Sequence, residues 1–236
     1  RIQTSDLGNT GGPAQTDDDT IAVNVNAAPT ITGVYARGTG TGAANWATSF
    51  LTYLSNNGLG DASLGYKLSV GANQLRSLPW VNVNTVSIQF SENVTIGKND
   101  LTLVGASNGP TLPTVAGSTF SYNSSTFVAT WTFASAFPRE KVLLHLGGTV
   151  VDIGGSALDG EWTTSSSTAS GDGVSGGNFD FRFNLLPGDF NFSNSVTFGE
   201  IGLAQTHVGK NTASTGFNYR EDFNASGSMT FGEIGQ

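Results

Sequence analysis

The 236-residue chain is long enough for one or two domains and for a sizeable hydrophobic core. Only 12% of its residues are charged, its net charge is −8, and it has no basic cluster, which argues against nucleic-acid binding. The absence of cysteine excludes disulfides and thiolate chemistry, and no apolar run approaches the roughly 20 residues of a membrane-spanning helix. Together, the 32 glycines and abundant Thr, Ser and Asn favour short strands joined by turns.

Residues 1–28 read as a β-hairpin or linker strand around a Gly-rich turn. Ile21, Val23 and Val25 alternate with smaller or polar residues, as in a half-buried strand. The stretch resembles the closing hairpin of cadherin-like, immunoglobulin-like repeats of bacterial surface proteins, with an acidic run at 17–19. We therefore expect an incomplete repeat whose strands need a partner, and whose acidic run either binds calcium between domains or lies in water.

One helix is predicted within "NWATSFLTYLSNNG", residues 45–58. Trp46, Phe50, Tyr53 and Leu54 recur on one helical face, and Asn57-Gly58 supplies the stop signal. We expect this helix to cover part of a β-rich core.

The remainder of residues 29–185 reads as strands. Apolar residues alternate with polar ones in four runs, which predicts an antiparallel β-sandwich. The runs are Val86/Ile88/Phe90, Phe127/Ala129/Trp131/Phe133, Val142/Leu144/Leu146 and Phe179/Phe181/Phe183.

Two segments of this body carry a family resemblance. "VSIQFSENVTIGKNDLTLVG" and the later "KVLLHLGGTVVDIGGSALDG" resemble bacterial immunoglobulin-like domains of the surface-layer type, over residues 82–160. The resemblance implies a mainly β fold with an immunoglobulin-like sandwich, here decorated by the short helix.

The C-terminal segment repeats itself. "DFNFSNSVTFGEIG" begins at Asp189 and "DFNASGSMTFGEIG" begins at Asp222, with eleven of fourteen residues identical. An EF-hand-type loop takes oxygen ligands from positions 1, 3, 5, 7, 9 and 12, because Ca²⁺ prefers six to eight hard oxygens. The expected ligands are Asp189, Asn191, Ser193, Ser195, Thr197 and Glu200 in the first loop, and Asp222, Asn224, Ser226, Ser228, Thr230 and Glu233 in the second.

Other loop positions fit the same interpretation. Position 6, where the backbone must turn with positive φ, holds Asn194 or Gly227. Position 8 holds Val196 or Met229, which predicts that the two loops pair through a short strand. Each loop brings only two formal negative charges, so we expect weak binding, with Kd about 10⁻⁴–10⁻³ M. The alternative is that both repeats are plain turns, since Asp, Asn, Ser and Gly are common turn residues.

The paired loops, the junction "LPGDFN" and the spacing resemble a type I dockerin module over residues 186–236. The resemblance implies calcium as cofactor and a cohesin-like protein partner. Ser at position 5 and Glu at position 12 depart from the usual pattern, and the chain is expected to stop at Gln236 before a second helix forms.

Outside the repeats the candidates are weaker. His145 and His207 are expected on the surface, and neither supports a catalytic triad or a transition-metal site. Asp152, Asp159, Glu161 and Asp172 suggest another calcium site, a glycosidase acid pair or solvated turns. Trp46, Trp80 and Trp131 are expected in the core, leaving Trp162 as the one exposed candidate for sugar stacking.

These patterns predict a non-enzymatic, calcium-binding structural protein that is extracellular or on a cell surface. A filament subunit assembled by β-strand donation, with calcium-reinforced joints, is one form of it. The partner would then be another copy or another surface protein, with no nucleic acid and no membrane span. The alternatives are a dockerin-type attachment module and a carbohydrate-binding accessory domain.

Overall fold

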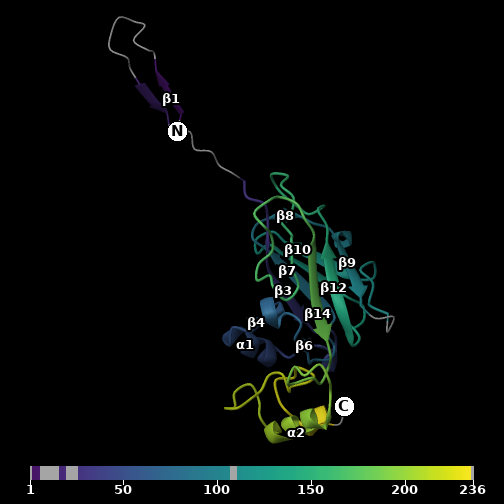
Figure 1. Ribbon diagram of the computed structural model, residues 1–236. Helices are drawn as coiled ribbons and strands as arrows, with labels where there is room; N and C mark the ends of the chain where they lie inside the picture. Colours follow the sequence, from purple (N-terminus) through teal and green to yellow (C-terminus); the bar gives the residue numbers. More distant parts are fainter. Residues whose placement is uncertain (1, 6–15, 20–25, 107–110, 235–236) are drawn as a thin grey trace, which may run out of the picture.

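The fold is mainly β, as predicted (Figure 1). The computed structural model describes residues 2–5, 16–19, 26–106 and 111–234. The strands are β1 (Ile2–Ser5), β2 (Thr16–Asp19), β3 (Ile31–Arg37), β4 (Gly60–Asp61), β5 (Gly65–Lys67), β6 (Ser77–Leu78), β7 (Thr85–Phe90), β8 (Val94–Thr95), β9 (Leu101–Gly105), β10 (Thr119–Asn123), β11 (Val128–Thr132), β12 (Glu140–Leu146), β13 (Val151–Asp152) and β14 (Phe179–Leu185). The α-helices are α1 (Thr48–Asn56), α2 (Phe198–His207) and α3 (Phe231–Ile234), and 3₁₀ helices span Gly42–Ala44, Gly71–Asn73 and Lys98–Asp100.

Two sheets form the main part of the molecule, which we call the two-sheet body. One has the strand order β10-β11-β7-β3-β5-β4, and the other has the order β6-β14-β12-β9. All neighbours pair antiparallel except β14 and β6, which are parallel. A small third sheet joins β13 to β8.

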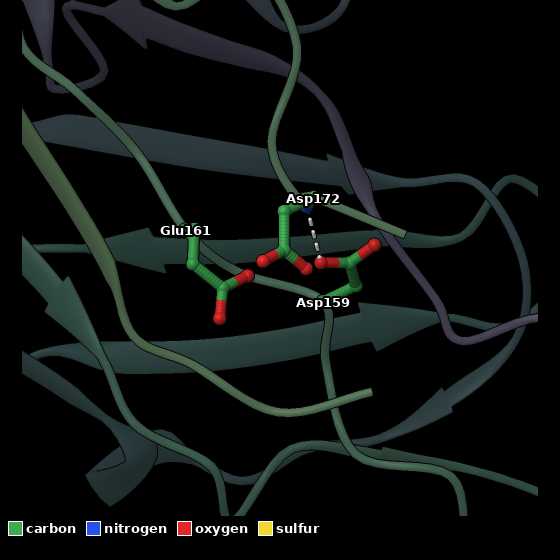
Figure 2. A group of neighbouring side chains, drawn as sticks. All are labelled: Asp159, Glu161 and Asp172. Atoms are coloured by element: carbon green, nitrogen blue, oxygen red, sulfur yellow. Dashed lines mark hydrogen bonds between the residues drawn. The ribbon is translucent and has the colours of Figure 1, made fainter. Parts of the chain in front are cut away.

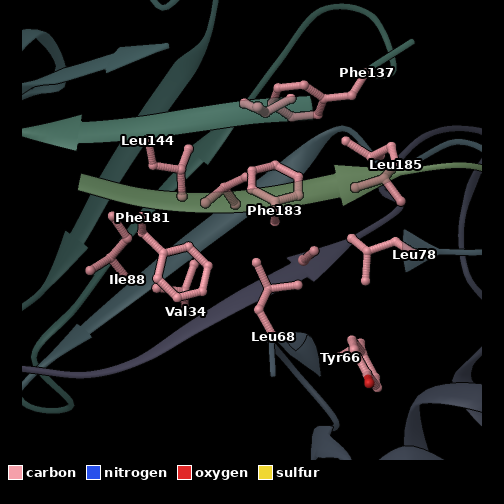
Figure 3. Packing of buried hydrophobic residues seen from close by; sticks show 14 of the residues in the cluster. Val34, Tyr66, Leu68, Leu78, Ile88, Phe137, Leu144, Phe181, Phe183 and Leu185 are labelled. Atoms are coloured by element: carbon pink, nitrogen blue, oxygen red, sulfur yellow. The ribbon is translucent and has the colours of Figure 1, made fainter. Parts of the chain in front are cut away.

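The core lies between these two sheets. Val34 of β3 and Ile88 of β7 meet Leu144 of β12 and Phe181 of β14, and all four side chains are buried (Figure 3). The alternation in the sequence explains this arrangement, because every second residue of a strand points to the same face. His145 lies on the outer face of β12, as expected, where its Nδ1 is 2.8 Å from Asp180 Oδ1.

The predicted helix is confirmed as α1. Phe50 and Leu54 are buried in it, and Trp46 lies buried just before it. The helix ends where expected, because Gly58 adopts a φ of +67° and the Asn57 side chain donates to the Tyr53 carbonyl at 2.8 Å.

The N-terminal segment does contain a hairpin, in which β1 pairs antiparallel with β2. Its second strand lies at Thr16–Asp19 and so includes the acidic run. The strand predicted around Ile21, Val23 and Val25 falls outside the described residues, as do the side chains of Asp17, Asp18 and Asp19.

The C-terminal segment, residues 186–234, packs on the end of the two-sheet body near α1 and β6 (Figure 1). Aromatic side chains join the two parts: Tyr219 lies 6.0 Å from Trp80 between ring centroids, and Phe217 lies 5.0 Å from Tyr53. The Trp80 Nε1 also donates to the Tyr219 carbonyl at 3.1 Å. A single apolar cluster therefore runs from the sheets into the tail.

A short second helix does form in the tail, so the expectation that no helix forms after the second loop is wrong. The second repeat runs into α3, which has four residues, whereas the first runs into the ten-residue α2.

Candidate metal centres

The two repeated loops have the same backbone shape. Asn194 and Gly227, at position 6, adopt φ values of +62° and +84°, as predicted for that position. Phe192 and Ala225, at position 4, also adopt positive φ, at +63° and +55°. Positive φ is costly for residues other than glycine. Its recurrence at positions 4 and 6 of both repeats therefore indicates that the two loops share one specific backbone conformation.

The aspartate at position 1 organises each loop. Asp189 and Asp222 are fully buried, and their carboxylates accept hydrogen bonds from the backbone N–H groups at positions 5 and 6. The donors are Ser193 (2.9 Å) and Asn194 (3.0 Å) for Asp189, and Ser226 (2.9 Å) and Gly227 (2.7 Å) for Asp222. Buried carboxylates held in this way present their remaining lone pairs at fixed positions.

Three more ligand positions come together in each loop. Asn191 Oδ1 accepts from Ser193 N at 2.8 Å, and Ser193 Oγ donates to the Ser195 carbonyl at 2.9 Å. The second loop repeats both contacts at 3.0 Å, with Asn224, Ser226 and Ser228 in the same roles. Oxygens from positions 3, 5 and 7 are thus gathered at one turn of the chain.

Glu200, at position 12 of the first loop, lies in the first turn of α2 and is only 1% exposed. Its Oε2 accepts from the Thr197 backbone N–H at 2.8 Å and from the Thr197 hydroxyl at 2.6 Å, which forms a capping box. These contacts lower the pKa of Glu200 below its usual value; the Thr197 hydroxyl contributes most, and the Asn191 side chain lies near enough to contribute. Buried carboxylates that keep their charge need such partners.

The second oxygen of Glu200 stands out. Oε1 is buried and accepts no hydrogen bond of normal length and angle from any described residue, although the Asn191 side chain lies nearby. An orphaned buried carboxylate oxygen is costly, and a hard cation within the loop is the partner whose chemistry fits it. The first loop therefore fits calcium by its all-oxygen donor set and by this unsatisfied atom.

The second loop repeats the hydroxyl contact at position 9. Thr230, at position 9, accepts from Gly232 N at 3.1 Å, just as Thr197 accepts from Gly199 N in the first loop. The side chain of Glu233, its position 12, lies outside the described residues.

The predicted pairing between the loops is wrong in the described structure. Met229 is 1% exposed, but Val196 is 50% exposed. Met229 forms backbone hydrogen bonds with Gly209 and Lys210, in the linker between the repeats, at 2.9 and 2.7 Å. The linker, rather than the first loop, supplies the strand partner.

The first loop is also fastened to its surroundings by contacts that the sequence did not reveal. The Ser77 hydroxyl, on β6, donates to Asp189 Oδ2 at 2.5 Å. The Arg220 guanidinium lies 3.2 Å from the centroid of the Phe192 ring, a cation–π contact. His207, expected on the surface of its helix, lies 2.6 Å from an oxygen of the buried Glu221.

A second group of candidate ligands lies in the two-sheet body, where Asp159, Glu161 and Asp172 face one another (Figure 2). Three of the four acidic residues singled out there are thus brought together. The fourth, Asp152, instead accepts hydrogen bonds from Asn26 Nδ2 and from Ser156 N.

Three tryptophans are core residues, as predicted: Trp46, Trp80 and Trp131 are at most 1% exposed. Trp162 is not the open platform that was expected. Its ring packs against Phe179 and Phe181, and its Nε1 donates to Gln74 at 3.1 Å.

No family model matches this chain, and comparisons with curated proteins and with solved structures find no significant match. The resemblances to immunoglobulin-like and dockerin-like modules therefore stay predictions. In the described part of the chain, no helix is long and apolar enough to cross a membrane.

Proposed function

We propose that this chain is a calcium-binding structural protein, non-enzymatic and extracellular, whose tail loops each bind one Ca²⁺. The observation that carries the proposal is the buried Oε1 of Glu200, a carboxylate oxygen without a partner among the described residues. The second loop supports it, because its backbone and its aspartate repeat those of the first.

The residues proposed to hold the ion are those at the six ligand positions. In the first loop Asp189, Asn191, Ser193 and Glu200 offer side-chain oxygens, and Ser195 offers its carbonyl. Thr197 sits at the position that is often bridged by water. Bound Ca²⁺ would supply the positive charge that compensates two carboxylates in each loop.

Calcium binding is expected to strengthen the contact between tail and body, because both loops touch the body directly. In the second loop, the Ala225 carbonyl accepts from Ala47 N at 2.9 Å, beside α1. In the first loop, Asp189 accepts from Ser77 on β6. A ligand that binds only the folded loops stabilises these contacts by linkage.

An extracellular setting suits this chemistry. Two formal charges in each loop predict weak affinity, with Kd about 10⁻⁴–10⁻³ M, which millimolar calcium outside cells would satisfy. The two-sheet body then serves as a rigid immunoglobulin-like spacer, and the tail as a dockerin-like end piece.

Metal analysis combined with limited proteolysis tests this function. The purified full chain is expected to bind calcium in millimolar solution, and a chelator is expected to accelerate cleavage within residues 190–230 while the sheets stay intact. Equal resistance of the tail with and without chelator, at matched ionic strength, would contradict the proposal.

Assembly by strand donation is the proposed mode of self-association. The outer strands β10 and β9 each have one unpaired edge among the described residues, so a strand from a second copy would find backbone partners there. Deleting residues 1–28, which contain the hairpin, should abolish filaments in electron micrographs. Filaments of unchanged length and number would refute this mode.

A second candidate function, attachment to a cohesin-like protein, is favoured by one observation. Phe198 and Phe231 occupy the same position in the two repeats and are 90% and 77% exposed. Paired exposed aromatics suit a protein interface. A pull-down that uses a cohesin-like protein as bait tests this function. The wild-type chain should be retained, and the Phe198→Ser/Phe231→Ser variant should not be, because it lacks both exposed rings.

A further inference from the structure

The acidic cluster lies in the two-sheet body, apart from the tail loops. Asp159, Glu161 and Asp172 each place one carboxylate oxygen within 4.8 Å of the others. Asp159 is 4% exposed, and its oxygens accept from Asp172 N at 2.8 Å and from Gly173 N at 2.9 Å. Figure 2 shows the Glu161 carboxylate directed toward the other two.

Glu161 supplies an independent sign that something is bound here. Its Oε2 is shut off from solvent and accepts no hydrogen bond from any described residue. Among the described residues, no cationic side chain forms an ion pair with Asp159, Glu161 or Asp172. Asp172 is exposed and Glu161 is partly buried, so water screens part of the repulsion in the cluster. The orphaned oxygen of Glu161 is the costly feature, and a bound cation would supply its missing partner.

The backbone closes tightly around these carboxylates. A Cβ at Gly171 would collide with the Asp159 carboxylate, and a Cβ at Gly177 would collide with that of Glu161. Both glycines also have positive φ, at +91° and +81°. The loop can therefore wrap the cluster only with glycine at these two places.

Hydrogen bonds join the cluster directly to residues 26–31, the segment that leads into β3, the first strand of the body. Asp159 N donates to the Pro29 carbonyl at 2.9 Å. The Ser170 hydroxyl donates to the Asp159 carbonyl at 3.0 Å and accepts from Ile31 N at 2.7 Å. Ligand binding at Asp159 would therefore strengthen the attachment of Pro29 and Ile31 through these three hydrogen bonds.

We propose that Asp159, Glu161 and Asp172 form a separate calcium site that fixes residues 29–31 to the body. An all-oxygen donor set selects a hard cation, and Ca²⁺ accepts the irregular geometry of a loop site more readily than Mg²⁺ does. The site has three carboxylates where each tail loop has two. It therefore fills at about tenfold lower calcium than the tail loops. This site is independent of the proposed tail function.

Calorimetric titration of the full chain with CaCl₂ tests the site. The wild-type chain should show one tight site and a weaker class. Glu161→Gln should weaken the tight site by at least about tenfold and spare the weak class, because only the cluster loses a charged ligand. Glu200→Gln should do the reverse, and Glu92→Gln, which changes a carboxylate in neither centre, should alter neither.

Thermal unfolding and amide hydrogen exchange test the site independently of the calorimetric titration. Without metal, Glu161→Gln should have a midpoint of thermal unfolding equal to or above that of the wild type, because it removes a like charge. Calcium should slow exchange of the Asp159 and Ile31 amides in the wild type but not in Glu161→Gln. Retention of the tight site in Glu161→Gln, filling by Mg²⁺ in preference to Ca²⁺, or unchanged exchange would each overturn the proposal.

Discussion

Replacing Glu200 with Gln isolates the metal-binding role of this side chain from its structural role. Gln can still reach back to the Thr197 backbone N–H, so the capping box and the start of α2 are preserved. The change removes one of the two carboxylate charges in the first loop, and it converts the orphaned Oε1 into a neutral amide atom. The variant should therefore fold but lose calcium at this loop.

The size of the effect follows from the charge of the loop. With Kd about 10⁻⁴–10⁻³ M, about 10 mM calcium stabilises each occupied loop by roughly 1.4–2.7 kcal/mol. In a chain of this length, each kcal/mol moves the unfolding midpoint by about 2–4 °C, so each loop contributes about 3–11 °C. Glu200→Gln should lose the share of one loop and keep that of the other.

Scanning calorimetry with added calcium or chelator measures this difference directly. Glu92→Gln, a matched substitution outside both candidate centres, should respond to calcium like the wild type. The reasoning would be refuted if Glu200→Gln gained as much from calcium as the wild type does, or if calcium moved the wild-type midpoint by less than about 1 °C.

Three further predictions concern the tail. Gly227→Ala should cost more in urea unfolding than Gly216→Ala: both residues have positive φ, which costs about 1–2 kcal/mol for alanine, but only at Gly227 would the Cβ also collide with Ser49 Oγ. Burial, above all, raises the pKa of Tyr219 to about 12. The stability that this raised pKa contributes below pH about 10 should therefore be lost as pH rises through about 12. The absorbance of the Tyr219 tyrosinate should appear only near that pH, and Tyr219→Phe should remove this late rise in absorbance. The lowered pKa of Glu200 contributes stability to the folded chain above pH 4.5, its usual pKa, and this stability is lost as pH falls through the lowered pKa. The free energy of unfolding of Glu200→Gln should therefore fall less steeply with acid than that of the wild type.

Local patterns in the sequence predicted the parts of this fold that depend on neighbouring residues. The face of α1, the alternating strands and the positive φ at Asn194 and Gly227 are all set within a few residues. Phe192 and Ala225 escaped prediction because nothing about those residue types signals left-handed backbone.

Contacts between distant segments could not be predicted in this way. Ser77 meets Asp189 across 112 positions of the chain, and no periodicity connects them. The acidic cluster was singled out from the sequence, but the separation of Asp152 from it depends on Asn26, which lies 126 positions away. The backbone partner of Met229 was missed for the same reason. Only the three-dimensional structure shows that the linker, and not the first loop, lies beside it.

The two ends of the body carry different attachments, and this has a mechanical consequence. Residues 26–31 are held at the end near β8, whereas the tail packs at the opposite end, and both β3 and β14 run between them (Figure 1). Tension applied through these attachments would load the β3–β7 and β12–β14 ladders along their strands, so that their hydrogen bonds resist together instead of opening one at a time. A molecule pulled in this direction should extend at its two ends long before its sheets rupture.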